Sequence, residues 1–118
     1  MLLAMKPDAF ARLKKLTNAI GPSGYEGETA AVWEAEARTF AAEVRRDVHG
    51  NTDAIINPGG KPVVMLAGHY DEIGFLITHI DEQGFLWIGP IGGWDSQIPQ
   101  GQRVVIMGSS TKEVAVLT

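Results

Sequence analysis

The chain has 118 residues, 45% of them hydrophobic and 20% charged, which predicts a globular protein with one modest core. The net charge of −4 and the lack of a basic patch argue against nucleic acid as a partner. Cysteine is absent, which excludes disulfides and thiolate metal sites and fits a cytoplasmic location. We also expect no signal peptide and no membrane partner, because no apolar run is long enough.

Two helices are predicted in the first third of the chain. Residues 7–20 begin with a proline, which suits the first helical position, and carry apolar residues on one face. A second helix is expected over residues 23–41, because Ser23 and Glu26 have the spacing of a capping box. Trp33 is expected to anchor the core from this second helix.

A pair of strands is predicted next, over residues 43–48 and 52–57, with a turn between them. His49 lies in this turn and is a candidate metal ligand by residue type alone. Its place beside Gly50 favours an exposed or turn-bonding role instead.

Residues 61–67 form a short apolar run that predicts a buried strand in the middle of a sheet. The chain turns polar at the C-terminal end of this run, where open α/β sheets place their sites. In extended backbone His69 and Asp71 would point to one side and Tyr70 away from it. An imidazole oriented by a carboxylate is a unit of metal coordination, although this spacing alone also fits an ordinary surface histidine.

Helical periodicity ends after Asp71, and short strands alone are predicted beyond it. The candidates are residues 74–80, 84–88, 103–107 and 113–117. His79 is expected to be structural, and Asp81 to belong to a turn. A part with helices followed by a part with strands predicts two structural units, with a boundary near residues 72–74.

Several ordered motifs resemble the M42 family of metallo-aminopeptidases, the glutamyl and tetrahedral aminopeptidases, some of which carry an endoglucanase label. The motifs are Gly-His-Tyr-Asp-Glu-Ile-Gly-Phe (68–75), Ile-Asp-Glu-Gln-Gly-Phe-Leu (80–86), Ile-Gly-Gly-Trp-Asp (91–95) and Gly-Gln-Arg-Val (101–104), with Pro-Ser-Gly-Tyr-Glu (22–26) and Asp-Val-His-Gly-Asn (47–51) upstream. The resemblance implies an α/β fold class. Residues 1–72 would be the N-terminal part of a mixed-sheet α/β/α metallopeptidase domain. Residues 73–118 would be the first strands of an inserted, barrel-like β domain that mediates dimer contacts.

The resemblance also implies a function: removal of N-terminal residues from peptide substrates with two metal ions, zinc or cobalt. His69 corresponds to a metal ligand, and Asp71 to the catalytic carboxylate that orients it. The family's other ligands and its general base lie downstream of the motifs present here. We therefore expect a truncated form with weak or absent metal binding and little activity, which forms a homo-oligomer.

Two other hypotheses are considered. A non-catalytic oligomerisation or binding module remains open. An endoglucanase is disfavoured, because glycosidases place two carboxylates across a sugar bond, whereas the adjacent Asp71 and Glu72 would diverge on a strand.

Overall fold

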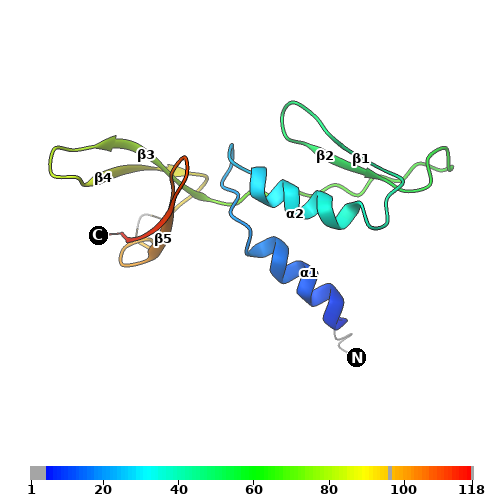
Figure 1. Cartoon of the computed structure of the whole chain (residues 1–118), viewed down its shortest axis with the longest axis horizontal. Coiled ribbons are helices and arrows are strands. Elements are labelled where there is room, and N and C mark those ends of the chain that lie inside the picture. The colour runs from blue at the N-terminus through cyan, green and yellow to red at the C-terminus, as the bar shows by residue number, and fades with distance from the viewer. Residues whose placement is uncertain (1–4, 96, 118) are drawn as a thin grey trace. The chain divides into compact units, whose positions relative to one another are not determined.

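The computed structural model describes residues 5–95 and 97–117, and these residues form a mixed α/β structure with small sheets (Figure 1). The elements are α1 (Pro7–Thr17), α2 (Gly27–Ala37), β1 (Glu43–Arg46), β2 (Thr52–Ile55), β3 (Gly74–Ile80), β4 (Leu86–Ile91), β5 (Arg103–Met107) and β6 (Lys112–Val116). Among the described residues we find no helix with the length and apolar character of a membrane span. The chain divides into two compact units, residues 1–74 and 75–118.

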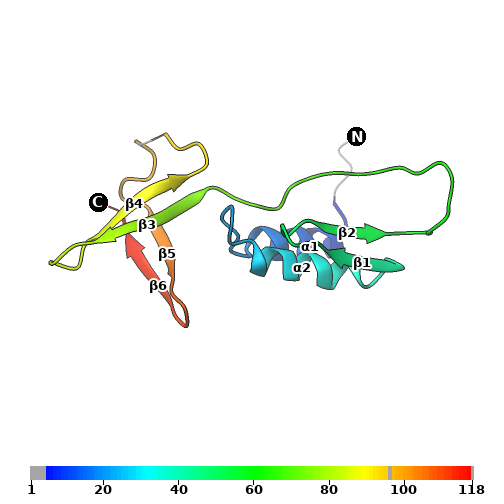
Figure 2. The ribbon, with the colours of Figure 1, turned by 90° about the horizontal axis from the view of Figure 1, so that it is seen from above.

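The first unit contains both helices and the β1–β2 hairpin, which packs against α2 through β2 (Figure 2). Both predicted helices are confirmed, but each ends three or four residues earlier than the apolar pattern indicated, at Thr17 and Ala37. An ion pair joins the hairpin to α2: the Arg46 Nε donates to a Glu34 carboxylate oxygen at 2.5 Å. The pair is partly shielded, since the Glu34 side chain is only 17% exposed.

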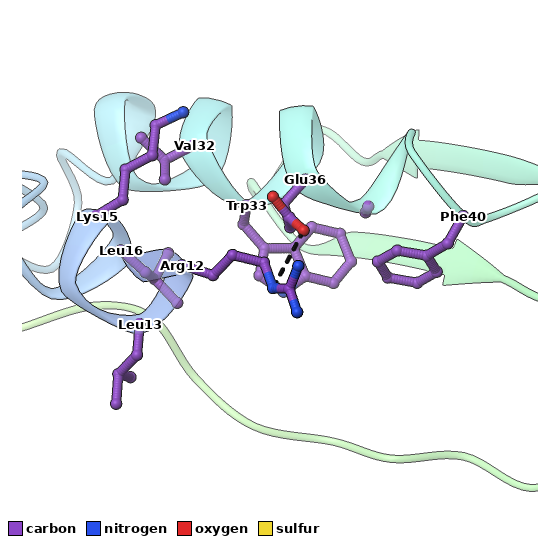
Figure 3. A pocket seen from close by; sticks show the side chains of 9 residues that line it. Arg12, Leu13, Lys15, Leu16, Val32, Trp33, Glu36 and Phe40 are labelled. Atoms are coloured by element: carbon purple, nitrogen blue, oxygen red, sulfur yellow. Dashed lines mark ion pairs between the residues drawn. The ribbon is translucent and has the colours of Figure 1, made fainter. Parts of the chain in front are cut away.

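The helices pack on each other around small side chains, with Ala19, Ala30 and Ala37 buried. A groove of about 170 Å³ lies along the helix pair, where Arg12 of α1 pairs with Glu36 of α2 at 3.4 Å (Figure 3). Trp33, expected as a core anchor, is half-buried and lines this groove.

The predicted capping box at the start of α2 is wrong. The residue that precedes the helix is Glu26, and its side chain makes no cap to the helix. The Glu26 carboxylate instead accepts the backbone N–H of Gly24 at 2.6 Å. The Ser23 hydroxyl is used elsewhere, in a contact with Asp71 that is 48 residues away in the sequence.

The β1–β2 hairpin closes through an Asp-x-x-Gly turn, as the polar stretch between the two predicted strands indicated. Its strands pair antiparallel, from Glu43 opposite Ile55 to Arg46 opposite Thr52. Gly50 has a φ of 93°, which glycine adopts without steric cost.

The β3–β4 hairpin of the second unit closes with the same turn design. In both turns one aspartate carboxylate oxygen accepts the backbone N–H groups two and four residues later, and the glycine N–H bonds to the aspartate carbonyl. These bonds run to Asp81 from Gln83, Gly84 and Phe85, at 2.9–3.0 Å. Local sequence therefore specifies both hairpin turns.

The second unit also contains the β5–β6 hairpin, which is antiparallel from Arg103 opposite Val116 to Met107 opposite Lys112. Phe75 and Trp94 stack in this unit, with ring centroids 4.7 Å apart and planes 16° apart. The four strands predicted after Asp71 are therefore confirmed, with shifted ends in β4 and β6.

The predicted central strand over residues 61–67 is wrong for this chain. Residues 61–67, which lie between β2 and β3, run without strand pairing within the described structure (Figure 2). Val63, Val64, Met65 and Leu66 are 76–96% exposed. A strand needs a neighbouring strand for its backbone groups, but β1 and β2 pair only with each other. The apolar pattern identified a segment suited to burial, but no partner strand covers it here.

Candidate functional site

His69 and Asp71 form a close pair, as their spacing predicted. The His69 Nδ1 lies 2.8 Å from Asp71 Oδ1. The His69 side chain is 84% exposed, so its Nε2 faces the solvent side of the pair. The two side chains meet without the predicted strand, since the extended backbone by itself brings residues two apart to one side.

The Asp71 carboxylate is held at both oxygens. Its second oxygen, Oδ2, accepts a hydrogen bond from the Ser23 hydroxyl at 2.5 Å. This bond, followed by the bond with His69, keeps the pKa of Asp71 below its ordinary value. An ionised carboxylate only accepts hydrogen bonds. A neutral His69 ring can donate to this carboxylate only through an Nδ1–H group, and in that tautomer Nε2 carries the lone pair.

Tyr70 fastens the segment to the β1–β2 turn. Its hydroxyl donates to the Gly50 carbonyl oxygen. The two segments thus border one cleft of about 650 Å³ within the first unit. Its lining includes Trp33 of α2, the turn residues Asp47, His49 and Asn51, and the segment from Met65 to Asp71.

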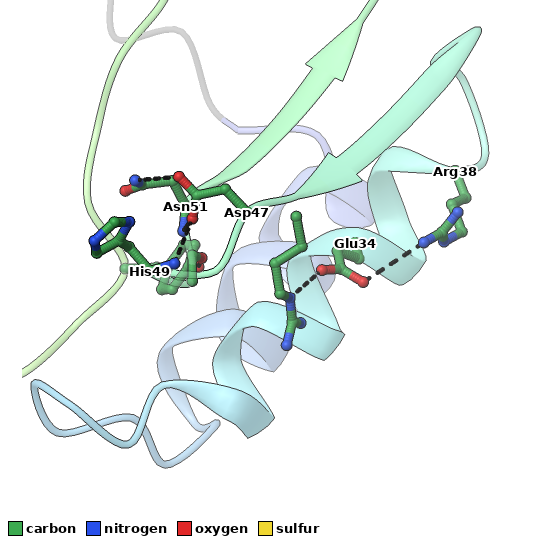
Figure 4. Close-up of polar contacts among 8 residues, drawn as sticks. Glu34, Arg38, Asp47, His49 and Asn51 are labelled. Atoms are coloured by element: carbon green, nitrogen blue, oxygen red, sulfur yellow. Dashed lines mark hydrogen bonds and ion pairs between the residues drawn. The ribbon is translucent and has the colours of Figure 1, made fainter.

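His49 has the exposed, turn-bonding position that was predicted for it. Its backbone N–H donates to Asp47 Oδ1 at 2.9 Å, and the Asn51 side-chain amide donates to Asp47 Oδ2 at 2.8 Å (Figure 4). His49 and His69 both line the cleft. However, in the part of the chain that the structure describes, no three His, Asp or Glu side chains form a group that could hold a metal ion.

Two other candidates lie in the second unit. His79 is exposed on β3. Asp81 serves its turn, and its pKa is lowered chiefly by the hydrogen bond from the Phe85 backbone. Neither residue belongs to the cleft of the first unit.

The β1–β2 turn is expected to weaken in acid through Asp47. The Asn51 amide, assisted by backbone N–H groups, holds the pKa of Asp47 below its ordinary value of 3.8. A lowered carboxyl pKa contributes stability that is fully present above the unfolded value and is lost as the pH falls through the folded value. The protection of the His49 and Asn51 amides from hydrogen exchange, relative to the intrinsic rate at the same pH, should therefore fall below pH 3.8. The Asp47→Asn variant keeps an acceptor oxygen and should lack this acid step. An equal step in both proteins would exclude Asp47 as its cause.

Sequence reasoning did not find the roles of Ser23 or the bond that Tyr70 makes. Ser23 was assigned to a helix cap because its spacing to Glu26 is the common local pattern. Its contact with Asp71 joins segments that only the fold brings together, so no local signal could have shown it.

Residues 50–118 match the family model of the M42 glutamyl aminopeptidases. The chain belongs to this family. It is 39% identical to a putative aminopeptidase of Acetivibrio thermocellus over 97 residues, covering 82% of the chain and 29% of that protein. It is 28% identical to the glutamyl aminopeptidase of Lactococcus lactis subsp. cremoris over 115 residues, covering 94% of the chain and 32% of that protein.

Solved structures agree with this family membership. A TET aminopeptidase from a marine sediment archaeon of the Thaumarchaeota superposes with a TM-score of 0.85 at 34% identity, covering 91% of this chain and 30% of that one. An aminopeptidase from the archaeon Desulfurococcus kamchatkensis superposes with a TM-score of 0.78 at 33% identity. The match covers 88% of this chain and 29% of that one. The chain thus spans about a third of the length of the proteins that it matches.

Proposed function

We propose that this chain forms part of a metal-dependent aminopeptidase that removes N-terminal residues from peptides. In this proposal His69 binds one of two divalent metal ions, zinc or cobalt, and Asp71 orients it. The observation that carries the proposal is the 2.8 Å contact of His69 with Asp71, inside the stretch that matches the family model. Relatives named as glutamyl and lysyl aminopeptidases support the reaction class.

A pair of metal ions lowers the pKa of a bound water and polarises the peptide carbonyl when both are present. The residues of this chain would help to bind one of the two ions. His69 offers Nε2 as the coordinating atom, and Asp71 fixes the ring through Nδ1. This arrangement of ligand and orienting carboxylate is typical of histidine metal sites.

The described residues supply one ligand for a metal ion, which is fewer than a complete metal centre requires. Catalytic zinc generally takes three protein ligands, and no group of three candidate ligands occurs among residues 5–95 and 97–117. We therefore propose that the chain by itself binds metal weakly and has little activity. The remaining ligands and the base would come from sequence that corresponds to the rest of the relatives' length.

We further propose that residues 1–72 belong to the metallopeptidase domain and residues 73–118 to an inserted β domain. The division of the chain into a helix-containing unit and a unit whose described residues form strands supports this assignment. So does the likeness to TET aminopeptidases.

A second candidate function is a non-catalytic module that associates with itself. The observation in its favour is the exposure of four consecutive apolar side chains at residues 63–66. Unpaired extended segments of this kind tend to pair with another chain. We propose that a second copy covers the segment when the chain is alone in solution.

The coding sequence beyond the codon for Thr118 distinguishes the two candidates. If the chain is part of an enzyme, we expect codons for further acidic and histidine ligands after the codon for Thr118. In the protein so encoded, His69→Ala should lower kcat/KM by at least about 100-fold, more than the loss typical of outer-shell residues. The matched control His79→Ala should change it little. A stop codon directly after Thr118 would favour the module, and full activity of His69→Ala would contradict the enzyme role.

A further inference from the structure

Residues 21–23 form a short strap that pairs with the segment carrying the His–Asp pair. The backbone N–H of Glu72 donates to the Gly21 carbonyl at 2.9 Å, and the N–H of Ser23 donates to the Glu72 carbonyl at 3.2 Å. Pro22 and Glu72 make an isolated parallel bridge. The Glu72 carboxylate adds a further bond, from the N–H of Gly21 at 3.0 Å. The strap is therefore anchored by backbone and side-chain contacts together.

The strap also packs closely against α2. Gly21 is buried, and a Cβ at this position would lie 2.2 Å from the Thr29 hydroxyl oxygen of α2. Close packing of this kind requires glycine. Since α2 and Glu72 hold the strap from two directions, the position of Ser23 relative to Asp71 is set by the fold.

The Ser23 hydroxyl contacts Asp71 on the oxygen that His69 does not use. Oδ2 accepts from Ser23 at 2.5 Å, while Oδ1 faces His69 Nδ1 at 2.8 Å. Without the first bond the carboxylate could rotate about its terminal torsion, which is broad for aspartate. A rotating carboxylate would hold the imidazole less firmly.

We propose that Ser23 is a positioning residue: its hydroxyl fixes the Asp71 carboxylate, which in turn holds His69 as the tautomer with its proton on Nδ1. The ring then presents the Nε2 lone pair outward before any metal arrives. The use of that lone pair for metal rests on the proposed function. The positioning itself does not, so the two can be tested separately.

The sharpest test compares Ser23→Thr with Ser23→Val in the full chain. The two side chains have similar shape, but only threonine keeps the hydroxyl. The readout is the tautomer of His69, measured from the ¹⁵N shifts of its ring at about pH 8.5, above the ordinary histidine range. In the wild type the Nδ1–H form should exceed the Nε2–H form by about tenfold or more, the effect of one charge-assisted hydrogen bond. Ser23→Val should reduce this ratio by about three- to tenfold, and Ser23→Thr should restore it.

Amide exchange at Glu72 shows whether the strap stays in place in each variant. If valine displaces the strap, Ser23→Ala replaces it in the comparison, since alanine removes the hydroxyl with less bulk. An Nε2–H tautomer in the wild type overturns the proposal. So does a ratio that is the same in the hydroxyl-free variant as in the wild type.

Zinc binding provides a second measurement. Zinc chloride alone is added, and its binding is followed through the ¹⁵N shifts of the His69 ring nitrogens. Loss of the hydroxyl should weaken zinc binding at Nε2 by about tenfold, as expected for a residue that helps to orient a metal ligand without contacting the metal. If the tautomer responds as expected but zinc does not bind His69, the positioning role stands and the proposed metal function loses its support. If zinc binds but the tautomer does not respond to the hydroxyl, the positioning role is refuted.

Discussion

The 118-residue chain, supplied with zinc or cobalt, is expected to release no leucine or glutamate from chromogenic peptide substrates above background. A productive centre of two metals requires ligands that hold both ions about 3.5–4 Å apart and a base near the water. His69 can supply one bond, and Asp71 is already committed at both oxygens, to His69 and Ser23. His49 lies in the same cleft, but no described third ligand joins the two histidines.

The assay should place kcat/KM at least about a thousandfold below the common enzyme range of about 10⁴–10⁸ M⁻¹ s⁻¹. His69→Ala is the matched variant, and it should give the same background rate as the wild type. Removal of metal with a chelator should also leave the rate unchanged. Robust turnover that disappears in His69→Ala would show that the chain, alone or as an assembly, completes a site by itself.

The second expected result is self-association of the isolated chain, reversed by charge in the segment of residues 63–66. Val64 and Leu66 are 76% and 96% exposed, and alternate residues of extended backbone share a side. Full burial of such a side chain is worth about 1.5–3 kcal/mol. Lysine at both positions should therefore raise the dissociation constant of self-association by at least about 100-fold.

Sedimentation velocity over a range of concentrations measures this effect. Val48→Lys is the control, since Val48 is 98% exposed but lies in the β1–β2 turn. It should associate like the wild type, because the one positive charge that it adds, against two in the double variant, lies outside the segment. A monomeric wild type at high concentration would exclude the association, and equal weakening by Val48→Lys would assign it to net charge instead.

Local interactions were readable from the sequence. Each hairpin turn at Asp47 and Asp81 is closed by bonds that span at most four residues, so the Asp-x-x-Gly pattern is sufficient to specify it. The pairing of His69 with Asp71 is equally local, because it needs only extended backbone over three residues. The two helices also followed from the period of their apolar residues.

Partners distant in the sequence were decided by the tertiary structure alone. Residues 61–67 have the composition of a buried strand, yet a strand forms only where another backbone supplies its hydrogen bonds, and the described structure gives this segment none. Ser23 has the local pattern of a helix cap, but the strap places its hydroxyl on Asp71, and a hydroxyl proton can serve only one of these acceptors at a time. The sequence by itself thus determined the turns, the helices and the His–Asp pair, since their bonds join near neighbours. Only the folded chain determined that residues 61–67 find no partner strand in the described structure and that Ser23 holds Asp71, because both outcomes depend on segments that the sequence separates.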